Sequence, residues 1–143
     1  MCPDYVKWTL DEKIDGISLI FASGHLSNPA SFYGHILLKF NTENTSNELN
    51  LLDTSLNYGA IMPENENALL YIFRGLFGGY DGSYTNQQFY RHNHKYAENE
   101  LRDLWNYELN LSKDQVSGIV DHSWELLGAK FTYYFLKQNC GYK

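Results

Sequence analysis

The alternation of hydrophobic and polar positions in the first third of the chain predicts three short β-strands. Residues 17–22 form an uninterrupted apolar run, which is typical of a buried strand. Residues 35–40 and 49–56 are two further apolar segments, separated by the polar residues 41–47. These two segments predict an antiparallel hairpin with a loose loop. Residues 23–34, rich in Ser, Gly, Asn and Pro, predict a loop before the hairpin.

The middle of the chain mixes helical and extended patterns. Apolar residues recur at helical spacing within 65–77, and the glycine-rich residues 78–82 are expected to stop that helix and form a flexible turn. Residues 87–96 are polar and aromatic, and we expect them to be extended. Residues 103–111 alternate between apolar and polar side chains, which predicts a strand.

A second helix is predicted to begin after Ser112, because Ser112 and Gln115 have the spacing of a capping box. Its predicted inner stripe consists of Val116, Ile119, Val120, Ser123 and Leu127. The chain shows no repeat and no internal linker, and 143 residues are the size of one ordinary domain. The expected fold class is therefore α+β, with an antiparallel sheet and packed helices.

Composition and charge narrow the function classes. The chain is 43% hydrophobic and 16% aromatic, so it has enough apolar material for a core, and its rings either fill that core or line a groove. The formal net charge is −6 and no basic run is present, which argues against nucleic-acid binding and against electrostatic docking on anionic lipid. No stretch approaches the ~18–20 apolar residues of a membrane span. The first residues lack the basic and apolar regions of a signal peptide.

The strongest chemical candidates are one cysteine and one histidine. The chain has two cysteines, Cys2 and Cys140, and neither lies in a CxxC pair, so a disulfide framework and a structural zinc site are not expected. Cys140 is the candidate nucleophile, although a cysteine in such a setting, taken alone, is more often structural. His35 opens a predicted strand directly after Gly34 and is the candidate base.

Two residues compete to orient His35. A hairpin turn centred near residue 44 would pair His35 with Asp53, and a slip of the register would make Asn57 the partner instead. Either side chain could hold the imidazole, and either could equally be a polar residue at a strand end, satisfied by water. His92 and His94 would share one face of an extended segment, but no acidic or thiol partner stands at metal-ligand spacing.

Two further motifs are excluded. The glycine-rich residues 75–82 lack the Lys-Ser/Thr pair of a phosphate-binding loop. Ser31 does not lie in a Gly-x-Ser-x-Gly elbow, which argues against a serine hydrolase.

Several short motifs occur in the order found in one bacterial family. They are NPASFYGHILL at residues 28–38, LNYGA at 56–60, RGLFGGYDGSY at 74–84, RDLWNY at 102–107 and YFLKQNC at 134–140. From about residue 5 to its end, the chain resembles the Lnb N-terminal periplasmic domain family. The resemblance implies a circularly permuted papain-like or NlpC/P60-like fold, in which the histidine comes early and the cysteine late. It also implies a periplasmic or cell-envelope location.

The resemblance further implies a lipoprotein N-acyltransferase that needs no cofactor and no metal. Cys140 would take an acyl chain from a phospholipid as a thioester and pass it to the α-amino group of a lipoprotein. His35 would serve as the base, with Asn57 the first and Asp53 the second choice as its orienter. Backbone amides around Cys140 would form an oxyanion hole. Expected substrate-binding residues are Ser31, Tyr58, Phe77, Tyr80 and Tyr134.

Family members are longer, exported and followed by membrane segments. We therefore expect this chain to be a fragment truncated just after the nucleophile, with contact to the membrane surface made through parts outside it. We also expect the isolated fragment to have little or no activity in repeated acyl transfer. Two other functions remain open at this stage: a thiol amidase or peptidase of cell-wall peptides that uses the same dyad, and a non-catalytic envelope binding domain in which Cys140 is structural.

Overall fold

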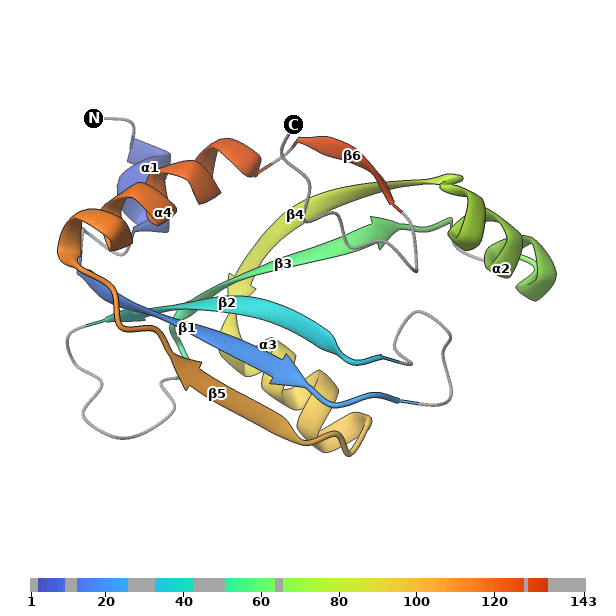
Figure 1. The fold of residues 1–143 in the computed structure, drawn as a ribbon, viewed down its shortest axis with the longest axis horizontal. Coiled ribbons are helices and arrows are strands. Elements are labelled where there is room, and N and C mark those ends of the chain that lie inside the picture. Colours follow the sequence, from blue (N-terminus) through green and yellow to red (C-terminus); the bar gives the residue numbers. More distant parts are fainter. Residues whose placement is uncertain are drawn as a thin grey trace.

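The computed structural model describes residues 3–9, 13–25, 33–42, 51–63, 66–127 and 129–133. Within these residues, six strands form one antiparallel sheet in the order β5-β1-β2-β3-β4-β6 (Figure 1). The strands are β1 (Ile14–Ala22), β2 (His35–Thr42), β3 (Thr54–Ile61), β4 (Tyr80–Gln88), β5 (Leu104–Glu108) and β6 (Lys130–Tyr133). The helices are α1 (Pro3–Trp8), α2 (Ala68–Phe77), α3 (Phe89–Asn93), the π-helical turn η2 (His94–Asn99) and α4 (Lys113–Leu126). The α+β class with an antiparallel sheet is therefore confirmed.

Helices cover both faces of the sheet. Figure 1 shows α1 and α4 side by side, and their side chains pack on one face of the central strands. The helix α3 and the turn η2 pack on the opposite face. The first core consists of Trp8, Ile17, Phe40, Leu56, Val116 and Val120. The second core consists of Ile20, Ala22, Leu37, Phe89 and Tyr96.

Burial on both faces explains the uninterrupted apolar run of β1. Successive side chains of a strand point to opposite faces, so Ile17 enters the first core while Ile20 and Ala22 enter the second. A strand that is covered on one face alternates between apolar and polar residues, whereas a strand covered on both faces does not. The same division in β2 places Phe40 in the first core and Leu37 in the second.

The helix α4 has the predicted beginning and inner stripe. The Ser112 side chain accepts a hydrogen bond from the Gln115 backbone N–H, and the Gln115 side chain accepts one from the Ser112 N–H, which completes the capping box. Val116, Val120 and Ser123 are buried, and the neighbouring apolar residues of the stripe pack against the first core. Local sequence signals are thus sufficient to define this helix.

The predicted hairpin has the wrong register. The third strand covers Thr54–Ile61 rather than residues 49–56, and Leu37 pairs with Asn57. His35 and Asp53 are therefore not opposite each other. The connection between β2 and β3 extends beyond the predicted loop of residues 41–47, because residues 51 and 52 are still in a turn and β3 begins only at Thr54.

Residues 87–96 are another correction, because β4 ends at Gln88 and the chain then turns into α3 and η2. Phe89, His92 and Tyr96 are the buried residues of this segment. Their spacing of three and then four residues is helical, so one side of the segment faces the sheet.

The helix α2 ends at Gly78, as predicted, but Tyr80 already begins β4, so the flexible turn expected over residues 78–82 is much shorter. Among the described residues, no helix is long and apolar enough to cross a membrane.

Candidate functional site

Gly34 fixes the path of the chain into His35. Its φ angle is +90°, and a Cβ atom there would lie 2.7 Å from both the Ala22 carbonyl oxygen and the Phe21 ring. Only glycine combines this backbone conformation with such a close approach. His35 then begins β2 opposite Ala22, the last residue of β1. His35 therefore lies at one end of the paired strands β1 and β2.

The His35 ring is hydrogen-bonded to Asn57 on the neighbouring strand β3, through Nε2 of the ring and Oδ1 of the amide. An amide oxygen only accepts, so Nε2 carries the proton. In the neutral ring the other nitrogen, Nδ1, then holds the free lone pair. Asn57 therefore selects the tautomer of His35 and fixes the plane of its ring.

The His35 ring lies against the aromatic side of η2. The centroids of the His35 and Tyr96 rings are 5.9 Å apart. The His92 ring stacks on the same tyrosine, with centroids 5.7 Å apart and planes inclined by 12°. The guanidinium carbon of Arg102 lies 4.8 Å from the centre of the Tyr96 ring, a cation–π distance. Tyr96 is thus the centre of a cluster that contains two histidines and an arginine.

Arg102 is a buried residue whose hydrogen bonds hold this cluster to the sheet. Its Nε donates to the Ser23 carbonyl at 2.5 Å, and its Nη2 donates to the Ala22 carbonyl at 3.1 Å. Its Nη1 makes an ion pair with Glu100 at 2.9 Å. Arg102 thus contacts Tyr96 of η2 and is hydrogen-bonded to the end of β1, the strand end that is paired with His35.

The surroundings of His35 favour its neutral form. Burial lowers the pKa of His35 below its ordinary value of 6.5, and the positive charges of Arg102 and Lys95 lower it further. The hydrogen bond that His35 donates to Asn57 and the charge of Glu100 oppose this shift. A neutral imidazole with a free Nδ1 lone pair can act as a general base.

His92 is a second buried histidine of this region. Desolvation lowers its pKa to about 4, and the charges of His35 and Lys95 act in the same direction. Its ring nitrogens contact the Gln87 side-chain nitrogen at 2.7 and 3.1 Å. His92 therefore remains neutral at pH 7 and packs as an aromatic ring behind Tyr96.

Asp53, the second choice as orienter, is engaged elsewhere on the same face. Its carboxylate makes a buried ion pair with Lys39 at 2.8 Å and accepts a hydrogen bond from the Thr42 hydroxyl at 3.1 Å. The Lys39 ammonium also lies over the Phe89 ring, 5.9 Å from its centre. The geometry thus joins Asn57, and not Asp53, to His35.

The structure describes three of the five predicted substrate-binding residues, and they occupy different surroundings. Phe77 is highly exposed on α2 and packs against Phe73, with centroids 4.6 Å apart and ring planes inclined by 42°. Tyr58 lies on β3 against Tyr84, with centroids 4.9 Å apart, and its ring covers Gly82.

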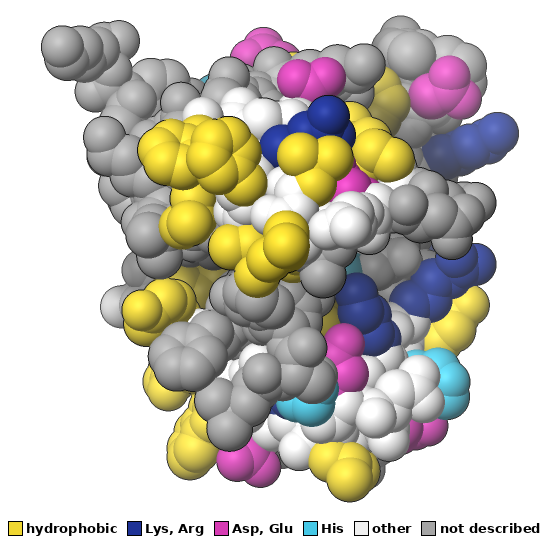
Figure 2. All heavy atoms as spheres, turned by 90° about the vertical axis from the view of Figure 1, so that its right-hand side faces the viewer, with side chains coloured by type: hydrophobic (Ala, Val, Ile, Leu, Met, Phe, Trp, Pro, Cys, Tyr) yellow, Lys and Arg dark blue, Asp and Glu magenta, His cyan; other side chains and the backbone are white. Residues whose placement is uncertain are grey.

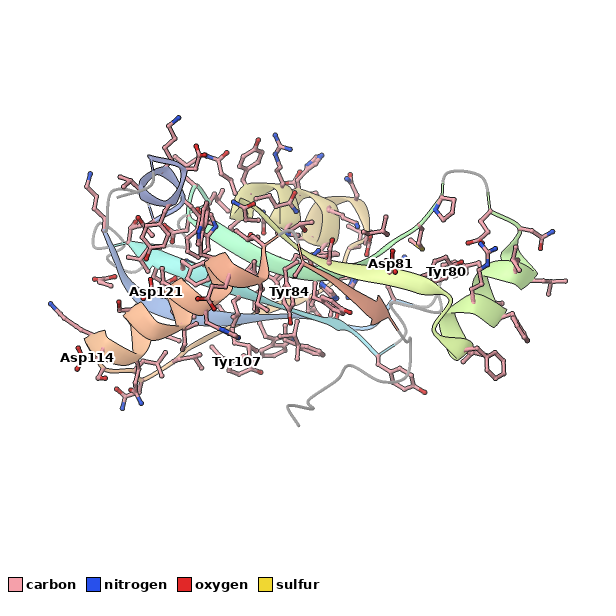
Figure 3. The ribbon with its side chains drawn as sticks, turned by 90° about the horizontal axis from the view of Figure 1, so that it is seen from above. Tyr80, Asp81, Tyr84, Tyr107, Asp114 and Asp121 are labelled. Atoms are coloured by element: carbon pink, nitrogen blue, oxygen red, sulfur yellow. The ribbon has the colours of Figure 1, made fainter. Side chains whose placement is uncertain are left out.

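Tyr80 is buried at the base of α2 (Figure 3), and its hydroxyl donates a hydrogen bond to Glu66. Burial, followed by the bond to Glu66, raises the pKa of Tyr80 to about 12. Its phenol therefore stays protonated at physiological pH.

Three predicted site residues lie outside the described residues, namely Cys140, Ser31 and Tyr134. Cys2 lies outside them as well. The part of the site that the structure describes is therefore the base and its surroundings.

Within the described residues, no group of three or more His, Cys, Asp or Glu side chains could hold a metal ion. His94 makes an ion pair with Glu98 at 2.6 Å on the surface, whereas His92 is buried against Gln87. The two histidines, predicted to share a face, are thus separated by the helical geometry of the segment.

Sequence reasoning missed the other members of the cluster around His35, namely His92, Tyr96 and Arg102. The spacing of Phe89, His92 and Tyr96 is the one signal that could have found two of them, because it marks the buried face of a helix. Arg102 gave no local signal, since its partners Ala22 and Ser23 are about 80 positions away in sequence.

The comparisons with known proteins give one match. Residues 4–143 match the family described as the Lnb N-terminal periplasmic domain. Searches among curated proteins and among solved structures found no match. The family match covers nearly the whole chain, and it includes His35, Asn57 and Cys140. This chain therefore belongs to the Lnb N-terminal periplasmic domain family, and it is a periplasmic domain of the cell envelope.

Proposed function

We propose that this domain is a cysteine-dependent acyltransferase of the cell envelope, with Cys140 as nucleophile, His35 as base and Asn57 as the residue that orients the base. The observation that supports the proposal is the hydrogen bond between His35 Nε2 and Asn57 Oδ1. It leaves Nδ1 as the ring nitrogen that can accept a proton, and a cysteine nucleophile requires a base that a third group holds in place. The lowered pKa of His35 adds to this, because it keeps the ring neutral before the reaction.

In the first half of the proposed reaction, His35 Nδ1 takes the proton of the Cys140 thiol. The thiolate attacks the carbonyl carbon of a phospholipid acyl ester, and backbone amides stabilise the oxyanion that forms. The ester C–O bond breaks, a thioester remains on Cys140, and the lysophospholipid leaves with the proton that His35 returns to its oxygen. No redox change occurs in this step.

In the second half, the α-amino group of a lipoprotein attacks the thioester carbonyl. His35 takes the proton of the amine, the C–S bond breaks, and the amide is released. The thiolate of Cys140 recovers a proton from His35, so the domain returns to its starting state. Water in place of the amine would give hydrolysis, which is why the two activities share one pair of residues.

We propose that the fold is a circularly permuted papain-like arrangement. Its support is the order of the parts: His35 opens a central strand early in the chain, and Cys140 comes after the last described strand β6. Ser31, Tyr58, Phe77, Tyr80 and Tyr134 remain predicted substrate-binding residues.

The test is a single-turnover incubation of the chain with an excess of a diacyl phospholipid, followed by intact mass spectrometry, which detects one acyl group per chain even where repeated turnover is slow. The proposal predicts one added acyl group, released by neutral hydroxylamine as a thioester is. The adduct should be lost in Cys140→Ala and reduced at least about a hundredfold in rate in His35→Gln, the effect of removing a general base. His94→Gln, an exposed histidine paired with Glu98, is the matched control and should leave the rate unchanged.

A second incubation with an amine-bearing lipopeptide separates the outcomes. Transfer of the acyl group to the peptide supports an acyltransferase. Release as free fatty acid, with no transfer, indicates a thiol hydrolase. An adduct that persists in Cys140→Ala, or no adduct with any donor, would favour a non-catalytic binding domain.

A further inference from the structure

The helix α2 has its apolar face turned outward, the reverse of an ordinary surface helix. Leu69, Phe73 and Phe77 are 79%, 60% and 68% exposed. Leu70, Ile72 and Leu76 are also exposed, so six apolar side chains share one broad face. A helix that packs on a globular core normally buries this face and exposes its polar residues.

The opposite side of α2 shows how the helix is attached to the sheet. Gly75 is buried, and Tyr71 packs on Tyr80 with ring centroids 6.1 Å apart. Asn67 caps the first turn by accepting a hydrogen bond from the Leu69 N–H at 2.9 Å. Gly75 and Tyr71 therefore form the side of α2 that packs on the rest of the domain, while the large apolar residues contact solvent.

The outward face is close to neutral in charge. Arg74 is the one charged residue within α2, and it makes an ion pair with Glu66, at 2.5 Å, just before the helix. Glu66 also accepts the Tyr80 hydroxyl hydrogen bond. Figure 2 shows hydrophobic side chains gathered at this end of the molecule. Ile61 and Met62, at the end of β3, extend the exposed apolar surface towards the sheet.

We propose that α2 is an interfacial helix that docks this domain on a lipid bilayer, with the six apolar residues inserted at the boundary between headgroups and acyl chains. Such helices lie in the plane of the membrane with their apolar face buried. A periplasmic domain of the envelope has a bilayer within reach. The paired charges of Arg74 and Glu66 fit zwitterionic headgroups, whereas the net charge of −6 does not fit an anionic surface.

The composition of the face favours a bilayer over a second copy of the chain. All six of its residues are apolar, and each is at least 40% exposed. A typical interface between two proteins has a polar rim and about ten direct hydrogen bonds, whereas these six side chains offer no donor or acceptor. In a bilayer each inserted apolar side chain contributes on its own.

Docking through α2 would orient the candidate site. The strand β3 leads to α2, and β2 is antiparallel to β3, so His35 at the start of β2 lies at the same end of the sheet as the end of β3. A docked helix would therefore turn the His35 end towards the lipid. The docking proposal does not depend on the proposed chemistry, because its test measures binding alone.

The test is co-sedimentation of the chain with phosphatidylcholine vesicles. The wild-type chain should bind, and Leu69→Gln/Phe73→Gln should lower the partition coefficient at least about tenfold, since it removes two inserted side chains. Leu51→Gln/Leu52→Gln is the matched control: both residues are exposed, but they precede β3 at the opposite end of the sheet. It should bind as the wild type does. Equal melting curves would show that all three chains are folded.

Three results with phosphatidylcholine vesicles would overturn the proposal. They are absence of wild-type binding, equal binding by the α2 variant, and a dimer in light scattering that the α2 variant loses while vesicles are not bound. As a second readout, Phe73→Trp should shift its fluorescence to the blue when phosphatidylcholine vesicles are added. Binding that appears only with phosphatidylglycerol and disappears in high salt would also contradict docking by a neutral apolar face.

Discussion

The two faces of the sheet differ in what their side chains can do. The face under α1 and α4 is packed with apolar residues, such as Ile17, Phe40 and Val120. The face under α3 and η2 combines apolar residues with His35, His92 and the buried pair of Lys39 and Asp53. Since one strand serves both faces, the same residues 35–40 supply core side chains to one side and polar chemistry to the other. The comparison teaches that one face chiefly stabilises the domain while the other holds its chemistry.

The largest expected effect is on the apolar face. Phe40 is 0% exposed and packs edge-on against Trp8, with centroids 5.3 Å apart. Phe40→Ala should lower the free energy of unfolding by about 4 kcal/mol, through lost burial and the cavity left behind. Urea unfolding at pH 7 measures it. Phe73→Ala, on the exposed face of α2, is the control and should change stability by less than about 0.5 kcal/mol. Similar losses in both variants would remove the distinction between core and surface.

The next largest effect is expected at the buried ion pair between Lys39 and Asp53, on the face under α3 and η2. Asp53→Ala leaves the Lys39 ammonium buried without its carboxylate and should cost about 3 kcal/mol. Lys39→Met/Asp53→Leu should recover most of that loss, because it removes both charges. Urea unfolding of the three chains checks this. A double variant as unstable as Asp53→Ala would contradict an account based on an unpaired charge.

A pH effect should follow from His92. Its pKa is lowered from 6.5 to about 4 by burial, so the unfolded chain binds a proton at higher pH than the folded chain does. This part of the stability is complete above pH 6.5 and is lost as the pH falls towards 4, by about 3 kcal/mol in all. Unfolding curves between pH 7 and pH 4 measure the slope. His92→Gln should flatten it, whereas His94→Gln should not.

A smaller effect is expected at Gly34. Gly34→Ala places a Cβ against Ala22 at an unfavourable φ angle, and it should cost about 1–2 kcal/mol and displace His35. Gly118→Ala is the matched control, since no atom lies within 4 Å of a Cβ there and the residue is inside α4. That change should stabilise the chain by about 0.5–1 kcal/mol. Destabilisation of equal size at both glycines would contradict the role assigned to Gly34.

Local sequence signals predicted the fold only where short-range contacts decide it. The capping box of Ser112 and Gln115 and the stripe of α4 are formed within a few residues, so the pattern was sufficient. The register of β2 and β3 was not predictable in this way, because it depends on a connection whose length the polar residues 41–47 do not fix. The segment 89–99 was misjudged because two members of its buried face, His92 and Tyr96, count as polar in a hydrophobic pattern.

The candidate site shows the same limit. His35 and Asn57 were named from the residues and from the ordered family motifs, and the structure joins them by a hydrogen bond. The cluster of Tyr96, His92 and Arg102 needed the three-dimensional fold, because it brings together η2, α3 and the end of β1. The physical reason is that a pKa is set by every neighbour in space, and the sequence reveals few of them.

The central claim is that His35 activates Cys140. Its most direct test is the rate at which iodoacetamide alkylates each thiol, measured by peptide mass spectrometry as a function of pH. Cys2 in the same chain is the internal control. The account predicts that Cys140 reacts at least about tenfold faster than Cys2 at neutral pH, because transfer of the thiol proton to His35 leaves Cys140 as a thiolate. His35→Gln should abolish that difference, and Asn57→Ala should reduce it. Equal reactivity of the two thiols in the wild type, or a fast Cys140 that does not depend on His35, would contradict it.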